Sequence, residues 1–440
     1  MEKFRNLIKH LLAGVFALFS VWLLQSCADT KATKALELTE EALANYNYVI
    51  GTQTVGAKYK FSNETDLVET AQQIQDMGSN LLKFSMHPRY CTENYDLPEN
   101  KNIKSLTDLA SMEPSMQKVL NMDFKYYHIW VYGFSQYSPE PEGEKNDTTQ
   151  IKFIGGYSDN YAEALYAELY DFTKHLLTTY QGSGKAFYLG HWEGDWHLRW
   201  HYDRTKKVDI ETLEGMIKWE KVRQKAIDDA KRDFPPKGME VYNYIEVNLV
   251  RAGIENPDKL TVTNSIISEV NPDFVSYSSY DATNPYKTEA DLNKTLKESL
   301  NYIESKLSPK ENLPKGKRVW IGEYGSPAIS YNQIDQDNRS KWVIKTGLEW
   351  GTPFILYWEM YNNEIKADTK EQVGYWLIDD KGEKQKIWHT HYNFYEDSKQ
   401  YLTDYYKKNS QMPSQVEYYK KALQFNSLKS SESLVTANTH

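Results

Sequence analysis

The hydrophobic and polar positions alternate between two patterns from about residue 46 to residue 406. Short apolar runs, rich in β-branched and aromatic residues, predict strands, and longer segments with an apolar residue at every third or fourth position predict amphipathic helices. The predicted strands are 47–53, 80–86, 126–134, 185–196, 241–250, 273–280, 318–323 and 353–358. The predicted helices are 66–77, 105–122, 159–180, 209–230, 264–270, 288–307, 339–350 and 396–406.

Eight strands that alternate with helices indicate an α/β protein with a (β/α)8 TIM-barrel fold. The barrel would occupy roughly 350 residues, more than the ~250 typical of this fold, so several loops are expected to be enlarged. One of them, the acidic segment 139–147, follows a strand and could either bind a ligand or act as a solvated spacer. The sequence shows no internal repeat of solenoid length.

The first 27 residues have the pattern of an export signal. Lys3, Arg5 and Lys9 precede an apolar stretch at 11–24, which is short for a membrane span, and Cys27 follows. The pattern resembles a bacterial lipoprotein signal, which implies a lipidated Cys27 and a membrane-anchored, extracytoplasmic protein of the cell envelope. Plain secretion and an uncleaved anchor are the alternatives. The predicted organisation is a signal peptide at 1–26, a polar tether at 27–45, the barrel at 46–408, and a C-terminal helix with a disordered tail at 409–440.

Composition narrows the function. The net charge of −9 argues against a nucleic-acid surface, which needs clustered Lys and Arg. Aromatic residues make up 14% of the chain, with 34 Tyr and 12 Trp. Some of them could stack on sugar rings, although most are expected to fill a large core. With Cys27 lipidated, Cys91 would have no partner for a disulfide, so the stability must come from the core.

Two predicted strands end in a glutamate flanked by glycine and aromatic residues. Glu193 follows the apolar run 187–190, and Glu323 follows Trp320-Ile321-Gly322. Burying an acid is costly unless it is paired or used, and barrel enzymes carry their chemistry at the carboxyl ends of their strands. Strands four and seven therefore carry the candidate catalytic pair.

Glutamates at the ends of strands four and seven, with an aromatic-Trp strand eight, resemble clan A of the retaining glycoside hydrolases. The resemblance implies that Glu193 is the general acid/base and Glu323 the nucleophile. Many clan members have Asn before the acid/base, whereas this chain has Trp192, so Trp192 or His191 is expected to replace that Asn. Glu193 should be protonated, and Glu323 should be ionised and held by Arg, Tyr or Asn donors.

Other polar and aromatic residues near strand ends are candidates for binding the sugar. Trp358 resembles the tryptophan that forms the floor of the subsite next to the cleaved bond, or it belongs to the core. Tyr277 or Tyr280 could donate to the nucleophile, and Trp192 and Trp196 could stack on sugars. Further candidates for sugar-hydroxyl ligands, or for partners of the catalytic groups, are Asp195, Glu246, Asn248, Asp281 and Glu359, of which Glu359 is also the main rival of Glu323 as nucleophile.

The sequence bears on three other classes of function. His389 and His391 have the spacing of a metal-ligand pair but follow strand eight, whereas barrel hydrolases place such a pair on strand one, so no metal is expected. GxGxxG and GxxxxGK[ST] motifs are absent, which disfavours a nucleotide site. A non-catalytic surface lipoprotein that binds carbohydrate is the remaining alternative.

The sequence thus predicts a glycoside hydrolase that cleaves O-glycosidic bonds of an oligo- or polysaccharide through a retaining mechanism. It needs no cofactor, and no obligate protein partner is evident. The sugar, the linkage, and exo or endo action are left open.

Overall fold

The computed structural model describes residues 1, 40–136, 153, 155–199 and 202–431. The chain forms two compact units. One consists of Met1–Tyr46 and Lys399–Pro413, and the other of Asn47–Ser398 and Ser414–His440. The predicted signal with Cys27 and the predicted loop 139–147 lie outside the described residues, and the predicted domain limits stay predictions.

Eight parallel strands form a closed barrel in sequential order, with β1 paired to β8. This confirms the predicted (β/α)8 fold. The strands are β1 (Ile50–Gln53), β2 (Leu81–Met86), β3 (Tyr126–Val131), β4 (Ala186–Gly190), β5 (Glu240–Val247), β6 (Phe274–Ser278), β7 (Val319–Tyr324) and β8 (Ile355–Tyr357).

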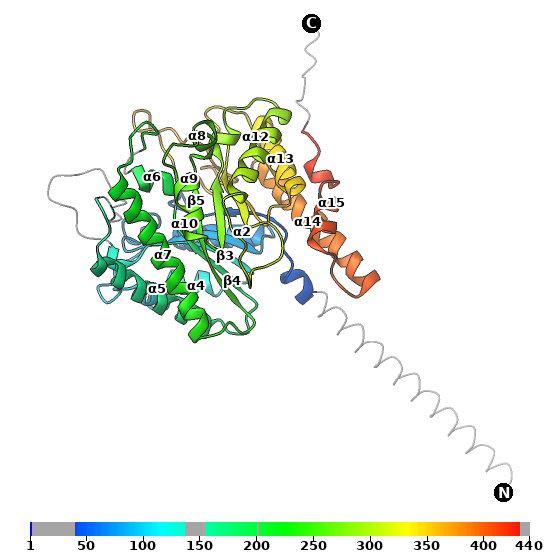
Figure 1. The fold of residues 1–440 in the computed structure, drawn as a ribbon. Helices are drawn as coiled ribbons and strands as arrows, with labels where there is room; N and C mark the ends of the chain where they lie inside the picture. Colours follow the sequence, from blue (N-terminus) through cyan, green and yellow to red (C-terminus); the bar gives the residue numbers. More distant parts are fainter. Residues whose placement is uncertain (2–39, 137–152, 154, 200–201, 432–440) are drawn as a thin grey trace. The chain divides into compact units, whose positions relative to one another are not determined.

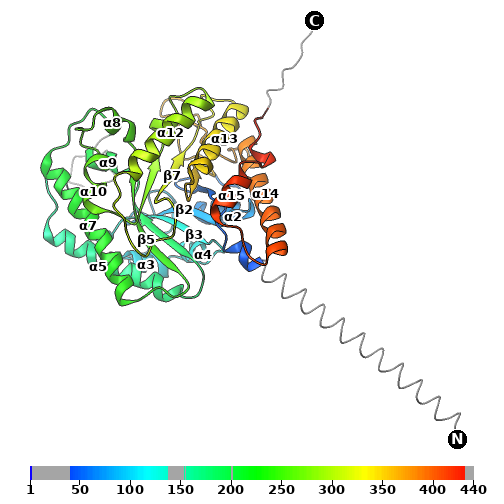
Figure 2. The ribbon, with the colours of Figure 1, turned by 45° about the vertical axis from the view of Figure 1, so that its right-hand side comes forward.

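Helices surround the strands, and α5 packs beside α7 in both ribbon views (Figures 1 and 2). The longer helices are α2 (Asp66–Asp76), α5 (Asp159–Thr179), α7 (Ile210–Asp233), α12 (Glu289–Glu304), α13 (Gln333–Trp350) and α14 (Lys386–Asn409). The shorter ones are α3 (Leu106–Met112), α4 (Pro114–Leu120), α6 (Gly194–Arg199), α8 (Val250–Glu255), α9 (Val262–Ser265), α10 (Ile267–Val270), α11 (Tyr280–Thr283) and α15 (Gln415–Ala422), with 3₁₀ turns η1 (Phe134–Gln136) and η2 (Asn426–Leu428).

Several predicted boundaries were wrong, for local reasons. The segment predicted as a helix over 105–122 is two helices, because Pro114 keeps Glu113 out of the helical region and occupies the first turn of α4. Helix α13 begins six residues earlier than predicted, because the Asn332 side chain accepts from the N–H groups of Ile334 and Asp335.

The most consequential correction concerns strand four. The predicted strand 185–196 ends at Gly190, and the unpredicted helix α6 begins at Gly194. Glu193 therefore lies in the connection between β4 and α6, past the end of the strand. Glu323 lies within β7, as predicted.

Aromatic side chains fill the interior of the barrel. The His128 ring stacks on Tyr188 at 4.6 Å and meets the edges of Phe354 at 4.5 Å and Trp320 at 4.8 Å. Tyr244 adds a ring contact with Trp320 at 5.0 Å. Burial, followed by the charge of Lys83, holds the pKa of His128 well below its usual value, so the imidazole is a neutral core group. Many of the chain's aromatic residues thus serve the core.

Two glycines at the barrel mouth lie where a side chain would collide with its neighbours. A Cβ on Gly190 would collide with the Tyr244 ring, and one on Gly322 would collide with the Ser276 hydroxyl and come within 3.2 Å of Glu246 Oε2. The glycine that precedes Glu323 is therefore required by the polar groups beside it. Among the described helices, none is long and apolar enough to cross a membrane.

Candidate active site

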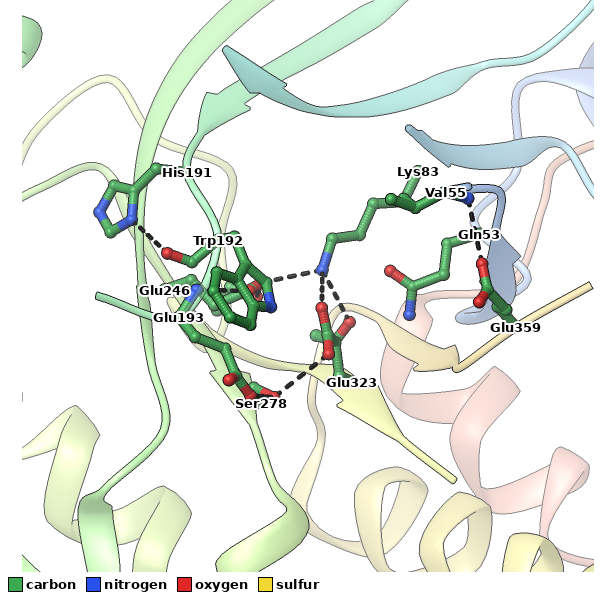
Figure 3. Close-up of polar contacts among 12 residues, drawn as sticks. Gln53, Val55, Lys83, His191, Trp192, Glu193, Glu246, Ser278, Glu323 and Glu359 are labelled. Carbon is green, nitrogen blue, oxygen red and sulfur yellow. Dashed lines mark hydrogen bonds and ion pairs between the residues drawn. The ribbon is translucent and has the colours of Figure 1, made fainter. Parts of the chain in front are cut away.

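Strand register brings the polar residues of the barrel mouth together. Glu246 on β5 pairs with Ser276 on β6, and Ser278 on β6 pairs with Glu323 on β7, after a shift in register at Tyr277/Ser278. Alternate residues of a strand face the same side, so Ser276 and Ser278 share the inner face of the barrel. Lys83 reaches the same point from β2 (Figure 3).

Lys83 holds two glutamates at once. Its Nζ lies 2.9 Å from Glu246 Oε2 and 3.0 Å from Glu323 Oε1, and donates to Gly322 O at 3.2 Å. The ammonium also lies 4.4 Å from the centre of the Trp130 ring. The side chains of this ion-paired trio are at most 3% exposed. Because a charge this deep must be paired, Lys83 and Glu246 together fix the position of Glu323.

Glu193 is held from three directions. Trp196 Nε1 donates to Glu193 Oε2 at 2.5 Å, and the backbone N–H of Glu193 donates to Glu246 Oε1 at 3.1 Å. Its Oε1 is within hydrogen-bond distance of the Ser278 hydroxyl. Glu246 therefore contacts both candidate catalytic residues, through Lys83 on one side and the Glu193 backbone on the other.

The Ser278 hydroxyl lies between the two candidate carboxyl groups. Its Oγ is bonded to Glu193 Oε1 and lies 3.3 Å from Glu323 Oε2 (Figure 3). Two hydrogen bonds that meet at one oxygen span at most about 6 Å. The nearest carboxyl oxygens of Glu193 and Glu323 are thus no farther apart than that.

Burial dominates the electrostatics of this pair. It raises the pKa of Glu193 well above the usual value, and the charge of Glu323 raises it further, against hydrogen bonds from Ser278 and Trp196. Burial also raises the pKa of Glu323, to about 8, but there the charge of Lys83 opposes the rise. Since Lys83 contacts Glu323 and not Glu193, the shared proton belongs on Glu193.

The donors to Glu323 differ from the prediction. Arg, Tyr or Asn donors were expected, and the structure provides Lys83 and Ser278. Full ionisation at neutral pH was also expected, whereas burial moves the ionisation of Glu323 upward. Desolvation in the closed barrel mouth, which depends on packing, accounts for this difference.

His191 does not face the site, contrary to the prediction. Its imidazole turns away from Glu193 (Figure 3), with Nε2 2.6 Å from Glu220 Oε1 and Nδ1 2.9 Å from Trp192 O. On the other side, the Trp192 N–H donates to the Tyr132 hydroxyl at 2.9 Å. His191 and Tyr132 thus fix the backbone of the loop that carries Glu193.

Asp195 and Asn248 also hold the local backbone. Asp195 accepts from the N–H groups of Asn248, Leu249 and Val262 at 3.0 to 3.2 Å, and Arg199 Nη1 lies 3.3 Å from its Oδ1. Asn248 Oδ1 in turn accepts from the Asp195 N–H at 3.1 Å. Of the two roles that the sequence left open for this pair, these contacts favour support of the site over binding of a sugar hydroxyl.

Tyr277 was wrongly predicted as a donor to the nucleophile. Its hydroxyl donates to Asp281, because Tyr277 alternates with Ser276 and Ser278 and so faces the helices outside the barrel. Burial, followed by the charge of Glu323, raises the pKa of Tyr280 well above its usual value. Its ring meets Tyr375 at 6.2 Å.

Tryptophans line the mouth around the two glutamates. The Trp130 ring lies 6.0 Å from Trp358 and 6.5 Å from Trp192. Trp192 and Trp196 are partly exposed, and both contact Tyr202, which is 67% exposed. Trp358 is only 6% exposed and so contributes to the core as well as to the mouth.

Glu359, the rival nucleophile, is held elsewhere. Its Oε2 accepts from the Val55 N–H at 3.0 Å, and Gln53 lies between it and Lys83 in Figure 3. Burial raises its pKa well above the usual value, against the hydrogen bond from the Val55 N–H. Lys83, the cation that favours ionisation of Glu323, contacts Glu323 and Glu246, so Glu323 is the better candidate nucleophile.

The site residues that the sequence analysis missed are Lys83, Ser278, Ser276 and Trp130. A signal existed for Lys83, because a lysine within the apolar run 81–86 must be paired when the strand is buried. The sequence contains no comparable signal for Ser276 and Ser278, since their role depends on the register between β5, β6 and β7.

The described residues contain no cluster of three or more His, Cys, Asp or Glu side chains that could hold a metal ion. His391 is buried, and its Nδ1 lies 2.9 Å from Ile387 O within α14. Cys27 lies outside the described residues.

No model of a protein family matches the chain, and no curated protein sequence matches it. Among solved structures, a GH5_18 protein from Streptomyces cattleya, in complex with Manb1-4GlcNAc, is similar with a TM-score of 0.53 and 10% identity, over 83% of this chain and 82% of that chain. The likeness shows a (β/α)8 barrel.

Two further structures agree on this fold. A GH5_18 protein from Bifidobacterium longum subsp. infantis has a TM-score of 0.51 and 10% identity, over 79% of this chain and 78% of that chain. An exo-beta-1,4-mannosidase from Opitutaceae bacterium strain TAV5 has a TM-score of 0.51 and 13% identity, over 80% of this chain and 60% of that chain. At such identities the similarity concerns the fold, and the chemistry must be argued from the site.

Proposed function

We propose that this protein is a retaining glycoside hydrolase that cleaves O-glycosidic bonds of an oligo- or polysaccharide, with Glu193 as general acid/base and Glu323 as nucleophile. The observation that carries the proposal is the placement of both carboxyl groups on one hydroxyl, that of Ser278. Retaining enzymes need carboxyl groups about 5 to 5.5 Å apart and inverting enzymes about 6.5 to 9.5 Å. Two carboxyl groups that are bridged by a single hydroxyl fit the shorter of these two separations.

The unequal surroundings of the two glutamates support their roles. Glu323 contacts an ammonium, which favours the ionised form that attacks the anomeric carbon. Glu193 has no such contact with Lys83 and keeps its proton, which it gives to the leaving oxygen. The resulting glycosyl ester on Glu323 is then hydrolysed by a water that the ionised Glu193 deprotonates.

The fold of the similar structures adds support of a different kind. Their printed names include GH5_18 proteins and an exo-beta-1,4-mannosidase. A fold hosts many chemistries, so this raises the expectation of carbohydrate chemistry and leaves the assignment to the residues.

The test is turnover by the wild type, Glu193→Gln and Glu323→Gln on aryl glycosides and polysaccharides. Both variants should lose at least about 10³-fold in kcat, since each removes an indispensable group. Azide should rescue Glu193→Ala and give a glycosyl azide with the configuration of the substrate. Glu113→Gln is the matched control, because Glu113 is also buried, but caps α4 outside the barrel.

The outcomes separate the proposal from its main alternative. Near-normal turnover by either variant would show that the pair is misassigned. If glycans bind the wild type without being cleaved, and both variants bind equally well, the protein is a carbohydrate-binding protein on a barrel scaffold.

We also propose that Cys27 carries a lipid that anchors the protein outside the cytoplasm, at the cell envelope. The proposal rests on the basic and apolar pattern that precedes Cys27 in the sequence. Labelled fatty acid should be incorporated into the wild type and not into Cys27→Ser, and the variant should lose its membrane association. Equal labelling of both would overturn the proposal.

A further inference from the structure

The hydrogen bonds around Glu193 determine where its proton lies. Trp196 Nε1 can only donate, and it donates to Glu193 Oε2. The proton of the neutral carboxyl is therefore on Oε1, which faces the Ser278 oxygen. Ser278 accepts this hydrogen bond and has its own hydrogen left to donate.

That remaining hydrogen has an acceptor in Glu323. Its Oε2 lies 3.3 Å from Ser278 Oγ, while its Oε1 is already bonded to Lys83. The resting arrangement is thus a chain in one direction, from the Glu193 hydroxyl to Ser278 and from Ser278 to the Glu323 carboxylate. Ser278 is fully buried, so bulk water does not compete for either bond.

We propose that Ser278 is a positioning residue that serves the two carboxylates in turn, donating to Glu323 before the glycosyl ester forms and to Glu193 after it forms. This inference rests on the proposed function. In the first step, the Glu193 proton moves to the leaving oxygen while Glu323 bonds to the anomeric carbon, so the negative charge moves from Glu323 to Glu193. The Ser278 hydroxyl keeps its proton throughout and only rotates toward the new charge.

The same logic distinguishes this role from simple support of the nucleophile. A donor that supported only Glu323 would help both steps, because Glu323 is the attacking group in the first and the leaving group in the second, but it would leave the pKa of Glu193 in the glycosyl ester unchanged. A donor that switches must also lower the pKa of Glu193 when this residue is the ionised base that activates water. The second step therefore tests the proposal.

The experiment compares the wild type and Ser278→Ala on two substrates of one sugar, a nitrophenyl and a dinitrophenyl glycoside. The dinitrophenolate leaves without a proton, so hydrolysis of the glycosyl ester becomes rate-limiting and a burst of product is seen. Ser278→Ala should lower both the burst rate and the steady rate on the order of ten-fold. Ser398→Ala, at another fully buried serine, is the matched control and should change neither.

A second readout is the pH profile of kcat/KM. The bond from Ser278 lowers the pKa of Glu323 in the free enzyme, so its loss should move the acid limb of kcat/KM upward by about one unit. The acid limb of the steady rate on the dinitrophenyl glycoside, which reports the ionisation of Glu193 in the glycosyl ester, should move upward as well. Ser278→Cys keeps the size of the side chain with a weaker donor and should lie between the wild type and Ser278→Ala. If Ser278→Ala does not fold, Ser278→Cys replaces it in both measurements.

The outcomes separate the two proposals. A wild type that cleaves no glycoside overturns both. If the wild type turns over and the glutamate variants do not, while the acid limb of ester hydrolysis in the Ser278 variants stays at the wild-type pH, only the switching role is overturned.

Discussion

Lys83 Nζ lies 3.0 Å from Glu323 Oε1, and both side chains are almost fully buried. The lysine lies on β2 and the glutamate on β7, so the contact crosses the barrel mouth. In this low-dielectric position the ammonium is the main factor that favours ionisation of Glu323.

Replacing Lys83 with Met should therefore raise the pKa of Glu323 further. The loss of an opposite charge at this distance moves a carboxyl pKa by about 1 to 3 units. A carboxyl with a higher pKa ionises only at higher pH, so the acid limb of kcat/KM should move up by that amount, and turnover near pH 7 should fall at least about ten-fold. Lys185→Met is the control, because Lys185 is buried beside Tyr127, away from the two glutamates. If the acid limb of kcat/KM in Lys83→Met stayed at the wild-type pH, this would contradict the role given to the ion pair.

The pH profile of the wild type should be shifted toward alkaline values. Activity needs ionised Glu323 and protonated Glu193. Burial raises the pKa of Glu323 to about 8 and raises that of Glu193 well above normal. As the pH rises, kcat/KM should increase through the first ionisation of the pair, near neutral to mildly alkaline pH, and decline at higher pH as Glu193 loses its proton. An acid limb below pH 5 would show that the two carboxyl groups are less desolvated in solution.

Glu193→Gln should stabilise the fold while it abolishes turnover. The unfolded chain releases the Glu193 proton above about pH 4.3, whereas the folded protein retains it, so the wild type loses stability as the pH rises between the two pKa values. Glutamine avoids this loss and can still accept from Trp196. The midpoint of thermal unfolding should rise by about 1 to 3 °C at pH 8 and change little at pH 4.

Glu323→Gln is the comparison for this prediction. It removes a charge from the contact with Lys83, so the rise in its unfolding midpoint at pH 8 should be smaller than the rise for Glu193→Gln. Equal shifts in the two variants, or a shift for Glu193→Gln that is larger at pH 4, would contradict the protonation states given to the pair.

Asp195→Asn should act on stability. An amide cannot accept on its nitrogen, so backbone donors from Asn248, Leu249 and Val262 would lose part of their bonding, and Arg199 would lose its counter-charge. Buried polar groups that are left without a partner in this way lower the free energy of unfolding by about 2 to 4 kcal/mol. Denaturant unfolding should show this loss, with KM within about two-fold of the wild type. Unchanged stability with a raised KM would instead make Asp195 a sugar ligand.

The sequence by itself determined the barrel and the catalytic candidates. Alternating strand and helix patterns are local, and each predicted strand overlaps one strand of the barrel. Glu193 and Glu323 could be selected because an acid after a buried strand is costly without a function. Their proximity then followed from the fold, since the carboxyl ends of all eight strands meet at one mouth.

Tertiary structure decided everything that depends on pairing across strands. Whether Tyr277 or Ser278 faces Glu323 depends on a register shift between β6 and β7, and a shift of one residue exchanges the two faces of a strand. Lys83 and Glu246 lie on other strands, so their contacts with the pair are set by barrel closure. The end of β4 at Gly190, which turns His191 outward, likewise depends on helix α6 and its packing. Contacts between residues that are distant in the chain depend on register and closure, which the local hydrophobic pattern does not encode.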